Sequence, residues 1–448
     1  MEKKEIIKLT LPSSYFEEWN EDKSLKCVMV CHDQDIDRRI LQQVAALKKI
    51  NVKSLIIALS HKAEDVLEKI DDVFIHRIGL SKIIPDCPAY WFYQKWHYKI
   101  GFSKKLKQSV KDYFHKINWN FYKFLLLSIY RCPSINNPIP FDFCFASALN
   151  CYEADFFIAH DLPALKASVD RAKELSVPVA YDSHEYYYQQ KVFSAYQKKL
   201  MQKRENEYIK ECDLIITINE TFSYIFKEKT KKENSIVIFN AHKFHNVNKT
   251  KTLHELIHKN EDEKIILFQG GLLKNRNIEN LIHGFSLLQK EKVNLVFMGP
   301  SDIAFKDKLA RKYVNLCNKS LFFLESIPQD LLLNITSTAT FGVIPYMPCD
   351  INTKYCTPNK FFEFIQAELP ILYNSRLLEV TKLANQVKGG CFGYDLSSPK
   401  LIKNAFEQVL IKISESDRLT LSKAKEIFSW ENEEKKFLSA IQKTMEKK

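Results

Sequence analysis

Two segments in the second half of the chain combine glycine, basic side chains and the start of a helix. In the first, FQGGLLKNRNIENLIHGF, an apolar strand runs into Gly270 and Gly271, and a helix begins near Asn277. Glycines let the backbone approach a ligand closely, and a helix N-terminus presents unpaired N–H groups to an anion. Arg276 stands in this loop and can hold phosphate oxygens through two parallel hydrogen bonds. The segment predicts an anion site, although an ordinary strand–helix turn with solvated basic residues has the same pattern.

The second segment, TPNKFFEFIQAELPILYNS, predicts a helix with a lysine and a carboxylate near its start. Pro358 suits the first turn of a helix, and Asn359 or Thr357 can cap it. Lys360 and Glu363 are three residues apart and share one helical face. The lysine can reach an anion at the helix N-terminus, and the carboxylate can accept hydrogen bonds from hydroxyl groups such as those of a ribose. A salt bridge between the two side chains is the simpler alternative.

In the first half of the chain, four polar residues follow two neighbouring predicted strands. His160 and Asp161 end one strand, and His184 and Glu185 end the next. Neighbouring strand ends of a parallel sheet open onto the same cleft, so these groups are expected to converge. One of them could hold or activate an acceptor hydroxyl. A histidine at a strand end can also simply cap loop carbonyls.

Short apolar runs alternate with helical stretches over most of the chain, which is typical of parallel α/β folds. The predicted strands cover residues 26–32, 53–59, 155–161, 178–185, 213–219, 235–241, 264–269, 293–299, 321–326, 340–346 and 370–374. A polar, lysine-rich stretch, residues 242–264, interrupts them and is the best candidate for a linker. The pattern predicts two doubly wound sheets with a cleft between two domains.

Bulk properties agree with a globular protein of two domains. The 448 residues exceed one ordinary core, and the hydrophobic fraction of 46% argues against disorder. No stretch reaches the roughly 20 apolar residues that span a bilayer, and the first residues lack the apolar region of a secretory signal. The expected location is therefore the cytoplasm, where the eleven cysteines would stay reduced.

Positive charge is concentrated in one segment, residues 85–150, where lysines alternate with aromatic residues. The formal net charge of the chain is +12. Such a segment suits an anionic membrane surface, which would make the protein peripheral on the inner face of a membrane. A helical insertion with buried aromatics and solvated lysines is an equal alternative, and a nucleic-acid partner is not expected.

One acidic motif resembles a metal site by spacing alone. DQDID, residues 33–37, contains Asp-x-Asp, but Arg38 and Arg39 follow directly and offset its charge. The motif is interpreted as the N-cap of a helix, and no metal and no cofactor are predicted.

The combination of these segments resembles the retaining glycosyltransferases of family 4, which have the GT-B fold. The matching pieces are 268–285, VFMGPS (296–301), PNKFFEFIQAELPIL (358–372), FSWENEEKKFL (428–438), AHDLPAL (159–165), YDSHE (181–185) and the opening helix and strand at 35–59. The resemblance covers most of the chain except about 85–150. It implies two Rossmann-like domains that face each other across a cleft.

The resemblance also implies roles for individual residues. Arg276 and Lys360 would bind the diphosphate of a nucleotide-sugar donor, with Asn359 beside them. Glu363 would bind the ribose hydroxyls, and Gly270 and Gly271 would let the loop approach the donor or the acceptor. At the end of an N-domain strand, a histidine would face the transferred sugar, and His160 stands in that place, with Asp161 and Glu185 as its catalytic neighbours.

The sequence departs from the family pattern at two positions. Of the family's usual pair of glutamates, which are separated by seven residues, only the second is present, as Glu363; Tyr355 stands at the first position and is counted among the donor-binding residues. Gly271 stands where the family usually has an arginine. The contacts to the donor sugar, and so its identity, stay open.

The resulting expectation is a hexosyltransferase-type glycosyltransferase (EC 2.4) that needs neither metal nor cofactor. It would move a sugar, with retention, from a nucleotide-diphosphate sugar to a glycan, lipid-linked or small-molecule acceptor, for example in polysaccharide biosynthesis. Residues 1–248 would form the acceptor domain, 249–425 the donor domain, and 426–448 a helix packing back on the first. The alternatives are a nucleotide-sugar epimerase of the same architecture and an inactive scaffold that binds nucleotide or membrane.

Overall fold

The computed structural model describes residues 7–10, 13–60, 65–70, 73–79, 141–248 and 251–446. The chain divides into two compact units, one of Met1–Val237 with Phe437–Lys448 and one of Ile238–Lys436. Most of the basic, aromatic segment 85–150 lies outside the described residues, and with it the expected membrane contact. Within the described ranges, no helix has the length and apolar character needed to cross a membrane.

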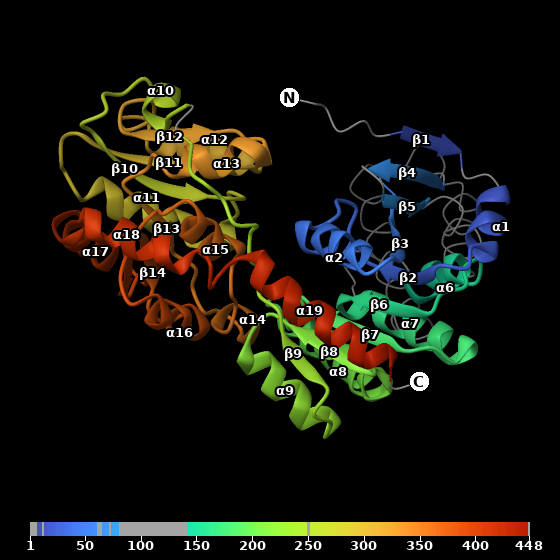
Figure 1. The fold of residues 1–448 in the computed structure, drawn as a ribbon. Helices are drawn as coiled ribbons and strands as arrows, with labels where there is room; N and C mark the ends of the chain where they lie inside the picture. The colour runs from blue at the N-terminus through green and yellow to red at the C-terminus, as the bar shows by residue number, and fades with distance from the viewer. Residues whose placement is uncertain are drawn as a thin grey trace, which may run out of the picture. The chain divides into compact units, whose positions relative to one another are not determined.

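The described part of the first unit contains a sheet of nine strands in the order β1-β4-β5-β3-β2-β6-β7-β8-β9 (Figure 1). They are β1 Ile7–Thr10, β2 Leu25–Val30, β3 Val52–Leu59, β4 Val66–Ile70, β5 Val73–Ile78, β6 Phe156–His160, β7 Val179–Ser183, β8 Leu214–Thr217 and β9 Ser235–Val237. Strand β4 is antiparallel to β1 and β5, and the other neighbours are parallel. Strand β2 lies between β3 and β6, so the strand order reverses there, and ligands of open α/β sheets bind at the carboxyl ends beside such a reversal.

Helices accompany this sheet, and several begin at side-chain caps. They are α1 Ser13–Glu21, α2 Arg38–Lys49, α6 Phe141–Leu149, α7 Asp161–Leu175, α8 Ala195–Tyr208 and α9 Glu220–Thr230. The Asp37 side chain accepts a hydrogen bond from the backbone N–H of Arg39 at 2.7 Å and caps α2. The interpretation of DQDID as a helix cap is therefore confirmed. Because this cap starts α2 just beyond β2, it brings the Arg39 side chain to the carboxyl edge of the sheet.

The second unit contains a parallel six-stranded sheet in the order β12-β11-β10-β13-β14-β15. Its strands are β10 Lys264–Gln269, β11 Val293–Met298, β12 Leu321–Leu324, β13 Phe341–Ile344, β14 Ile371–Asn374 and β15 Cys391–Tyr394. Strand β10 is flanked by β11 on one side and β13 on the other, so the order reverses between β10 and β13. The loops after these two strands are where this fold places a ligand.

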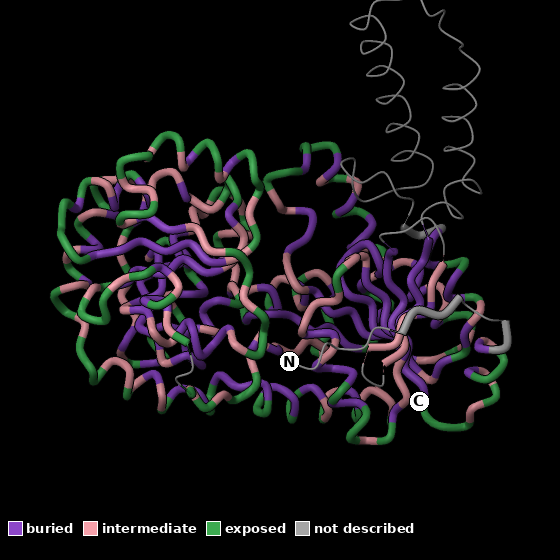
Figure 2. Tube along the Cα trace, turned by 90° about the horizontal axis from the view of Figure 1, so that it is seen from above, coloured by how far each residue is buried: buried purple, intermediate pink, exposed green. Residues whose placement is uncertain are grey.

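Hydrophobic cores cover both faces of this second sheet. Alternate residues of β10 point to opposite faces: Leu267 belongs to one core and Phe268 to the other. The helices are α11 Ile278–Ser286, α12 Ile303–Lys312, α13 Gln329–Thr336, α14 Ile351–Lys354, α15 Asn359–Gln366, α16 Leu378–Val387, α17 Pro399–Lys412 and α18 Glu415–Ala424. Figure 2 shows the strands of both units mainly in the buried colour, with exposed residues on the outer turns. Burial on both faces explains why these strands are continuous apolar runs in the sequence.

The predicted linker and the last helix are both ordered parts of the structure. Helix α10, Leu253–Ile257, lies inside the polar stretch 242–264, and its two terminal residues are buried in the core of the second unit. The capping box of Thr252 and Glu255 starts this helix. The stretch is therefore less of a free linker than its composition suggests. Helix α19, Trp430–Met445, ends the described chain, and its last residues belong to the first unit.

Four strands were not among those predicted: β1, β4, β5 and β15. The hairpin of β4 and β5 carries charged residues between its apolar ones, and its register pairs Glu68 with Ile75. Strand β15 is four residues long and contains Gly393. Short or charged strands at a sheet edge lack the continuous apolar run that identifies a buried strand.

A tight helix contact in the second unit gives a test of this packing. A Cβ added at Gly284 would lie 2.6 Å from Cγ2 of Ile402 and 2.8 Å from the carbonyl oxygen of Pro399. We expect Gly284→Ala to lower the free energy of unfolding by about 1–2 kcal/mol, because overpacking outweighs the gain in helix propensity. Urea denaturation measures this. The control is Ile411→Ala. Ile411 lies on α17, like Ile402, but it is 72% exposed, so its substitution should change stability by less than about 0.5 kcal/mol. An unchanged Gly284→Ala protein would contradict the described contact.

Candidate functional site

The loop after β10 has a backbone that only glycine adopts easily. Gly270 has a φ of 109°, and Gly299, at the end of the neighbouring β11, has a φ of 144°. A Cβ on Gly299 would meet the Gly270 carbonyl oxygen at 2.7 Å, so the two loops touch through their backbones. Because Gly270 has no side chain, its backbone can be approached closely.

Two cations occupy the edge of that space. A Cβ placed on Gly270 would lie 3.3 Å from Nζ of Lys360 and 3.5 Å from Nη1 of Arg276. Arg276 comes from a single 3-10 turn, Lys274–Arg276, and Nη1 donates to the Gly271 carbonyl oxygen at 3.1 Å. Lys360 comes from the first turn of α15. The structure thus brings Lys360 next to Gly270, Gly271 and Arg276, which lie 84 to 90 positions earlier in the sequence.

The Lys360 ammonium is buried without a carboxylate. Its residue is 6% exposed, it donates to the hydroxyl oxygen of Tyr346, and it lies 4.6 Å from the Tyr346 ring centroid and 5.5 Å from that of Phe268. Arg276 lies with its Cζ 5.4 Å from the same Tyr346 ring. In the described parts of the chain, no aspartate or glutamate pairs with either cation. A buried charge without a counter-ion is unfavourable, so this place favours an anion.

Glu363 is held one turn further along α15. Its Oε2 accepts a hydrogen bond from Nε2 of Gln269 at 2.7 Å, and Gln269 in turn accepts one from the Thr336 hydroxyl. The alternative of a Lys360–Glu363 salt bridge is wrong, because the lysine donates to Tyr346 instead. Glu363 therefore keeps a fixed position as a hydrogen-bond acceptor.

The start of α15 differs in detail from the prediction. The N-cap residue of the helix is Pro358, which makes no side-chain cap hydrogen bond, rather than Asn359 or Thr357. Asn359 is exposed, and Thr357 is buried. The backbone N–H of Phe361 donates to the Pro358 carbonyl oxygen at 2.9 Å, and Lys360 lies in this first turn of the helix. Tyr355 is half-buried just beyond α14, and the structure does not place it in contact with the two cations.

A second cluster lies at the carboxyl edge of the first unit's sheet. Strands β6 and β7 pair His160 with Asp182, and His184 follows two residues later. Nδ1 of His160 lies 3.0 Å from Nε2 of His184, and Oδ2 of Asp182 lies 3.5 Å from each of these nitrogens. Arg39 grips Asp182 through two hydrogen bonds of 2.9 and 2.8 Å, and Gln43 adds a third of 2.6 Å.

Burial and the neighbouring charges set the protonation states of this cluster. Burial would raise the pKa of Asp182, but the Arg39 guanidinium and the His184 imidazole hold it well below its usual range. Burial acts to lower the pKa of His184, yet Asp161 and Asp182 raise it to about 9. Burial lowers the pKa of His160. In the 3.0 Å contact between Nε2 of His184 and Nδ1 of His160, one ring nitrogen donates and the other accepts.

The Nε2 of His160 is buried and has no hydrogen-bond partner among the described residues. Asp161 sits beside it with a φ of 62°, an uncommon value for a residue other than glycine, and its carboxylate accepts from the His184 backbone N–H at 2.9 Å. Burial raises the pKa of Asp161. The Glu185 side chain accepts from Gln190 and also adds negative potential at Asp161. The four predicted polar groups therefore do converge, as the strand ends implied.

The ligand atoms of His160, Asp182 and His184 are close enough together to hold a metal ion. The other contacts of Asp182 argue against that use. Its two oxygens already accept from Arg39 and Gln43, and a divalent cation would lie beside the Arg39 charge. A hydrogen-bonded charge network accounts for these distances without a metal.

Sequence reasoning missed three residues of these two sites. In the sequence, Asp182 is an unremarked part of YDSHE, Arg39 only offsets the charge of DQDID, and Tyr346 only ends a predicted strand. The Arg39–Asp182 pair joins positions 143 apart, which no local pattern reveals. The signal for Tyr346 was its place directly after β13, at the reversal of strand order.

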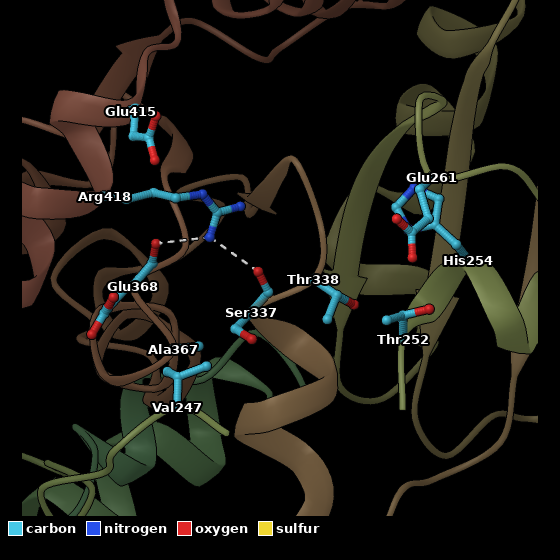
Figure 3. Close-up of a pocket in the computed structure, with 10 residues that line it drawn as sticks. All are labelled: Val247, Thr252, His254, Glu261, Ser337, Thr338, Ala367, Glu368, Glu415 and Arg418. Atoms are coloured by element: carbon cyan, nitrogen blue, oxygen red, sulfur yellow. Dashed lines mark hydrogen bonds between the residues drawn. The ribbon is translucent and has the colours of Figure 1, made fainter. Parts of the chain in front are cut away.

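A pocket of about 460 Å³ lies at the opposite edge of the second sheet. It is lined by residues before β10 and before β13, among them Glu261 and Thr338 (Figure 3). Arg418 reaches into it and donates to the carbonyl oxygens of Ser337 and Glu368. Its polar groups bind the protein's own backbone, and ligands of parallel sheets bind at the carboxyl ends. We therefore do not assign the site here.

The two parallel α/β units define a GT-B fold, and comparison with known structures confirms it. Sucrose-phosphate synthase from Thermosynechococcus elongatus matches with a TM-score of 0.67 and 12% identity, over 95% of this chain and 100% of that chain. HepE from Anabaena, in complex with UDP-glucose, matches with a TM-score of 0.60 and 12% identity, over 94% and 100% of the respective chains. A proposed UDP-N-acetylglucosamine 2-epimerase from Listeria monocytogenes matches with a TM-score of 0.55 and 10% identity, over 95% and 97%. No model of a known protein family and no curated protein matches the sequence.

The raised pKa of His184 predicts how stability depends on pH. Because its folded pKa of about 9 lies above the unfolded value of about 6.5, its stabilisation is complete below pH 6.5 and is lost as the pH rises towards 9. We expect the free energy of unfolding to fall between pH 6.5 and 9, and His184→Gln to show a smaller fall. Urea denaturation across this range measures both. An equal fall in the two proteins would show that His184 is not the titrating group.

Proposed function

We propose that this chain is a glycosyltransferase of the hexosyltransferase type, which takes a sugar from a nucleoside-diphosphate donor. The observation that carries the proposal is the pair of cations, Lys360 and Arg276, which meet above Gly270 with no carboxylate partner among the described residues. They lie at the reversal of strand order in the second sheet, beside the start of α15. A diphosphate supplies the negative charge that this arrangement lacks.

The same groups suit the chemistry of glycosyl transfer. When the bond between the sugar and the diphosphate breaks, negative charge grows on the leaving phosphate. Fixed cations and helix N–H groups stabilise that charge without reorganising, and such preorganised electrostatics often dominates catalysis. We therefore propose that Arg276, Lys360 and the start of α15 support departure of the leaving group and that no metal is needed.

Glu363 fits the ribose end of the donor. Its carboxylate is oriented by Gln269 and can accept hydrogen bonds from two hydroxyl groups. Asn359 and Tyr355 are proposed to border the donor, because both lie within five residues of Lys360 in the sequence. A thermal-shift panel of nucleotides and nucleotide sugars identifies the base and the sugar that the site binds.

In the first unit, we propose that the His160 cluster serves the acceptor or the transferred sugar. The buried Nε2 of His160 has no partner among the described residues and can form a hydrogen bond with a hydroxyl group, while Asp161 and Glu185 supply acceptors nearby. We propose a glycan, lipid-linked or small-molecule acceptor and transfer with retention, as in the family that the motifs resemble. A cytoplasmic enzyme at the inner face of a membrane suits such acceptors.

Two of the matched structures contain a bound nucleotide or nucleotide sugar, which supports this proposal. HepE was seen with UDP-glucose, and starch synthase IV from Arabidopsis thaliana with ADP and acarbose. An epimerase is the second candidate, because one matched structure is a proposed UDP-N-acetylglucosamine 2-epimerase. The products separate the two functions: a transferase yields a glycosylated acceptor, whereas an epimerase yields a sugar isomer without any acceptor.

Removing either cation tests the donor site. We expect Arg276→Ala and Lys360→Ala each to lose on the order of 2–4 kcal/mol of transition-state stabilisation, seen as a fall in kcat/KM. The donor is found first by a thermal-shift panel of nucleotides and nucleotide sugars, in which one UDP-, GDP- or ADP-sugar should raise the melting temperature.

The same panel on Arg276→Ala should show a reduced or absent shift. Lys306→Ala is the matched control, because its charge is paired with Glu325 on the surface. Near-native rates in both site variants would refute the assignment. No shift with any nucleotide in the wild type would instead favour an inactive scaffold.

A further inference from the structure

Tyr346 lies directly after β13 and is fixed more firmly than a loop residue usually is. Its ring packs against both cores of the second unit. Its carbonyl oxygen accepts a hydrogen bond from Nδ2 of the buried Asn374 at 2.8 Å. The preceding Pro345 carbonyl accepts one from Nδ2 of Asn277 at 3.1 Å, and Asn277 is the residue that follows Arg276. The tyrosine and the arginine loop are thereby tied to each other.

The ring of Tyr346 is shared by both cations of the site. Nζ of Lys360 lies 4.6 Å and Cζ of Arg276 lies 5.4 Å from its centroid. A cation within about 6 Å of an aromatic face is attracted by the negative face of the ring. The neutral ring of Tyr346 therefore attracts both Lys360 and Arg276, whose positive charges would otherwise repel each other.

The hydroxyl group completes this contact. Nζ of Lys360 donates to the Tyr346 hydroxyl oxygen, and no carboxylate of the described chain competes for the ammonium. A carboxylate in this place would neutralise the lysine and weaken its attraction for phosphate. A neutral aromatic ring with a hydroxyl orients the lysine and leaves its full charge available.

We propose that Tyr346 is a positioning residue for the diphosphate of the donor. It holds Lys360 and Arg276 side by side before the donor arrives, so that binding does not have to overcome their repulsion or order their side chains. This inference rests on the proposed donor site. It adds to that site a residue that touches the cations and acts through them.

Two substitutions separate the ring from the hydroxyl. Tyr346→Phe keeps the ring face, and Tyr346→Leu removes it. We expect the affinity for the nucleoside diphosphate that the wild type binds best, among UDP, GDP and ADP, to fall about tenfold or more in Tyr346→Leu. In Tyr346→Phe the affinity should fall by less than in Tyr346→Leu, because Arg276 keeps its contact with the ring while Lys360 loses the hydroxyl that accepts its hydrogen bond. Titration calorimetry measures both, and melting temperatures establish that the variants are folded.

A double-mutant cycle tests whether Tyr346 acts through Lys360. In a Lys360→Met background, Tyr346→Leu should cost clearly less than it does alone, because one of the two cations that it positions is gone. Tyr394→Leu is the matched control: Lys412 donates to the Tyr394 hydroxyl at 2.9 Å and lies 5.6 Å from its ring, and this substitution should leave affinity unchanged.

The outcomes distinguish this inference from the function on which it rests. If the wild type binds a diphosphate and Tyr346→Leu binds it equally well, or if the effects of the two substitutions simply add, Tyr346 has no positioning role. If the wild type binds none of the three diphosphates, the proposed donor site itself fails, and with it this inference.

Discussion

The second unit depends on a charge imbalance: a nearly buried lysine and a neighbouring arginine share one small space with no carboxylate of the described chain to neutralise them. Such an arrangement costs stability unless the surroundings hold it in place. The surroundings here are rigid, because the glycine loop, the aromatic ring after β13 and the start of α15 are all anchored in a sheet buried on both faces. An anion that binds here neutralises the unpaired positive charge. In a structural ion pair, by contrast, the protein's own carboxylate already does so.

At the carboxyl edge of the first unit's sheet, by contrast, the buried charges are paired. There Asp182 and Arg39 are both buried and fully paired, so their charges cancel and the pair fixes the ends of β2, β6 and β7. Among the described residues of this cluster, the Nε2 of His160 and the Oε1 of Gln43 are buried without a hydrogen-bond partner. One unit thus offers strong positive potential, and the other offers a few oriented hydrogen-bond groups. This division suits a charged donor and an uncharged hydroxyl acceptor.

Much of the fold and part of the site could be predicted from the sequence. The parallel strands that are buried on both faces, such as β10 and β11, are continuous apolar runs, and the predicted GT-B fold is confirmed. Strands near a sheet edge, such as β4, carry charges and were missed. Arg276 and Lys360 were found because glycine and a helix start accompany them locally. Tyr346 and Asp182 were not found, because their roles arise from contacts between distant segments.

The most direct test of the central claim asks how affinity depends on the number of phosphates. Titration calorimetry with a nucleoside, its monophosphate and its diphosphate would be compared for the base that the protein prefers, at one fixed salt concentration. If two uncompensated cations form a diphosphate site, affinity rises at each step, most steeply where the second phosphate is added, and that last step shrinks in Lys360→Met. Equal affinity for the nucleoside and the diphosphate would show that these cations do not bind the donor, and would contradict the account.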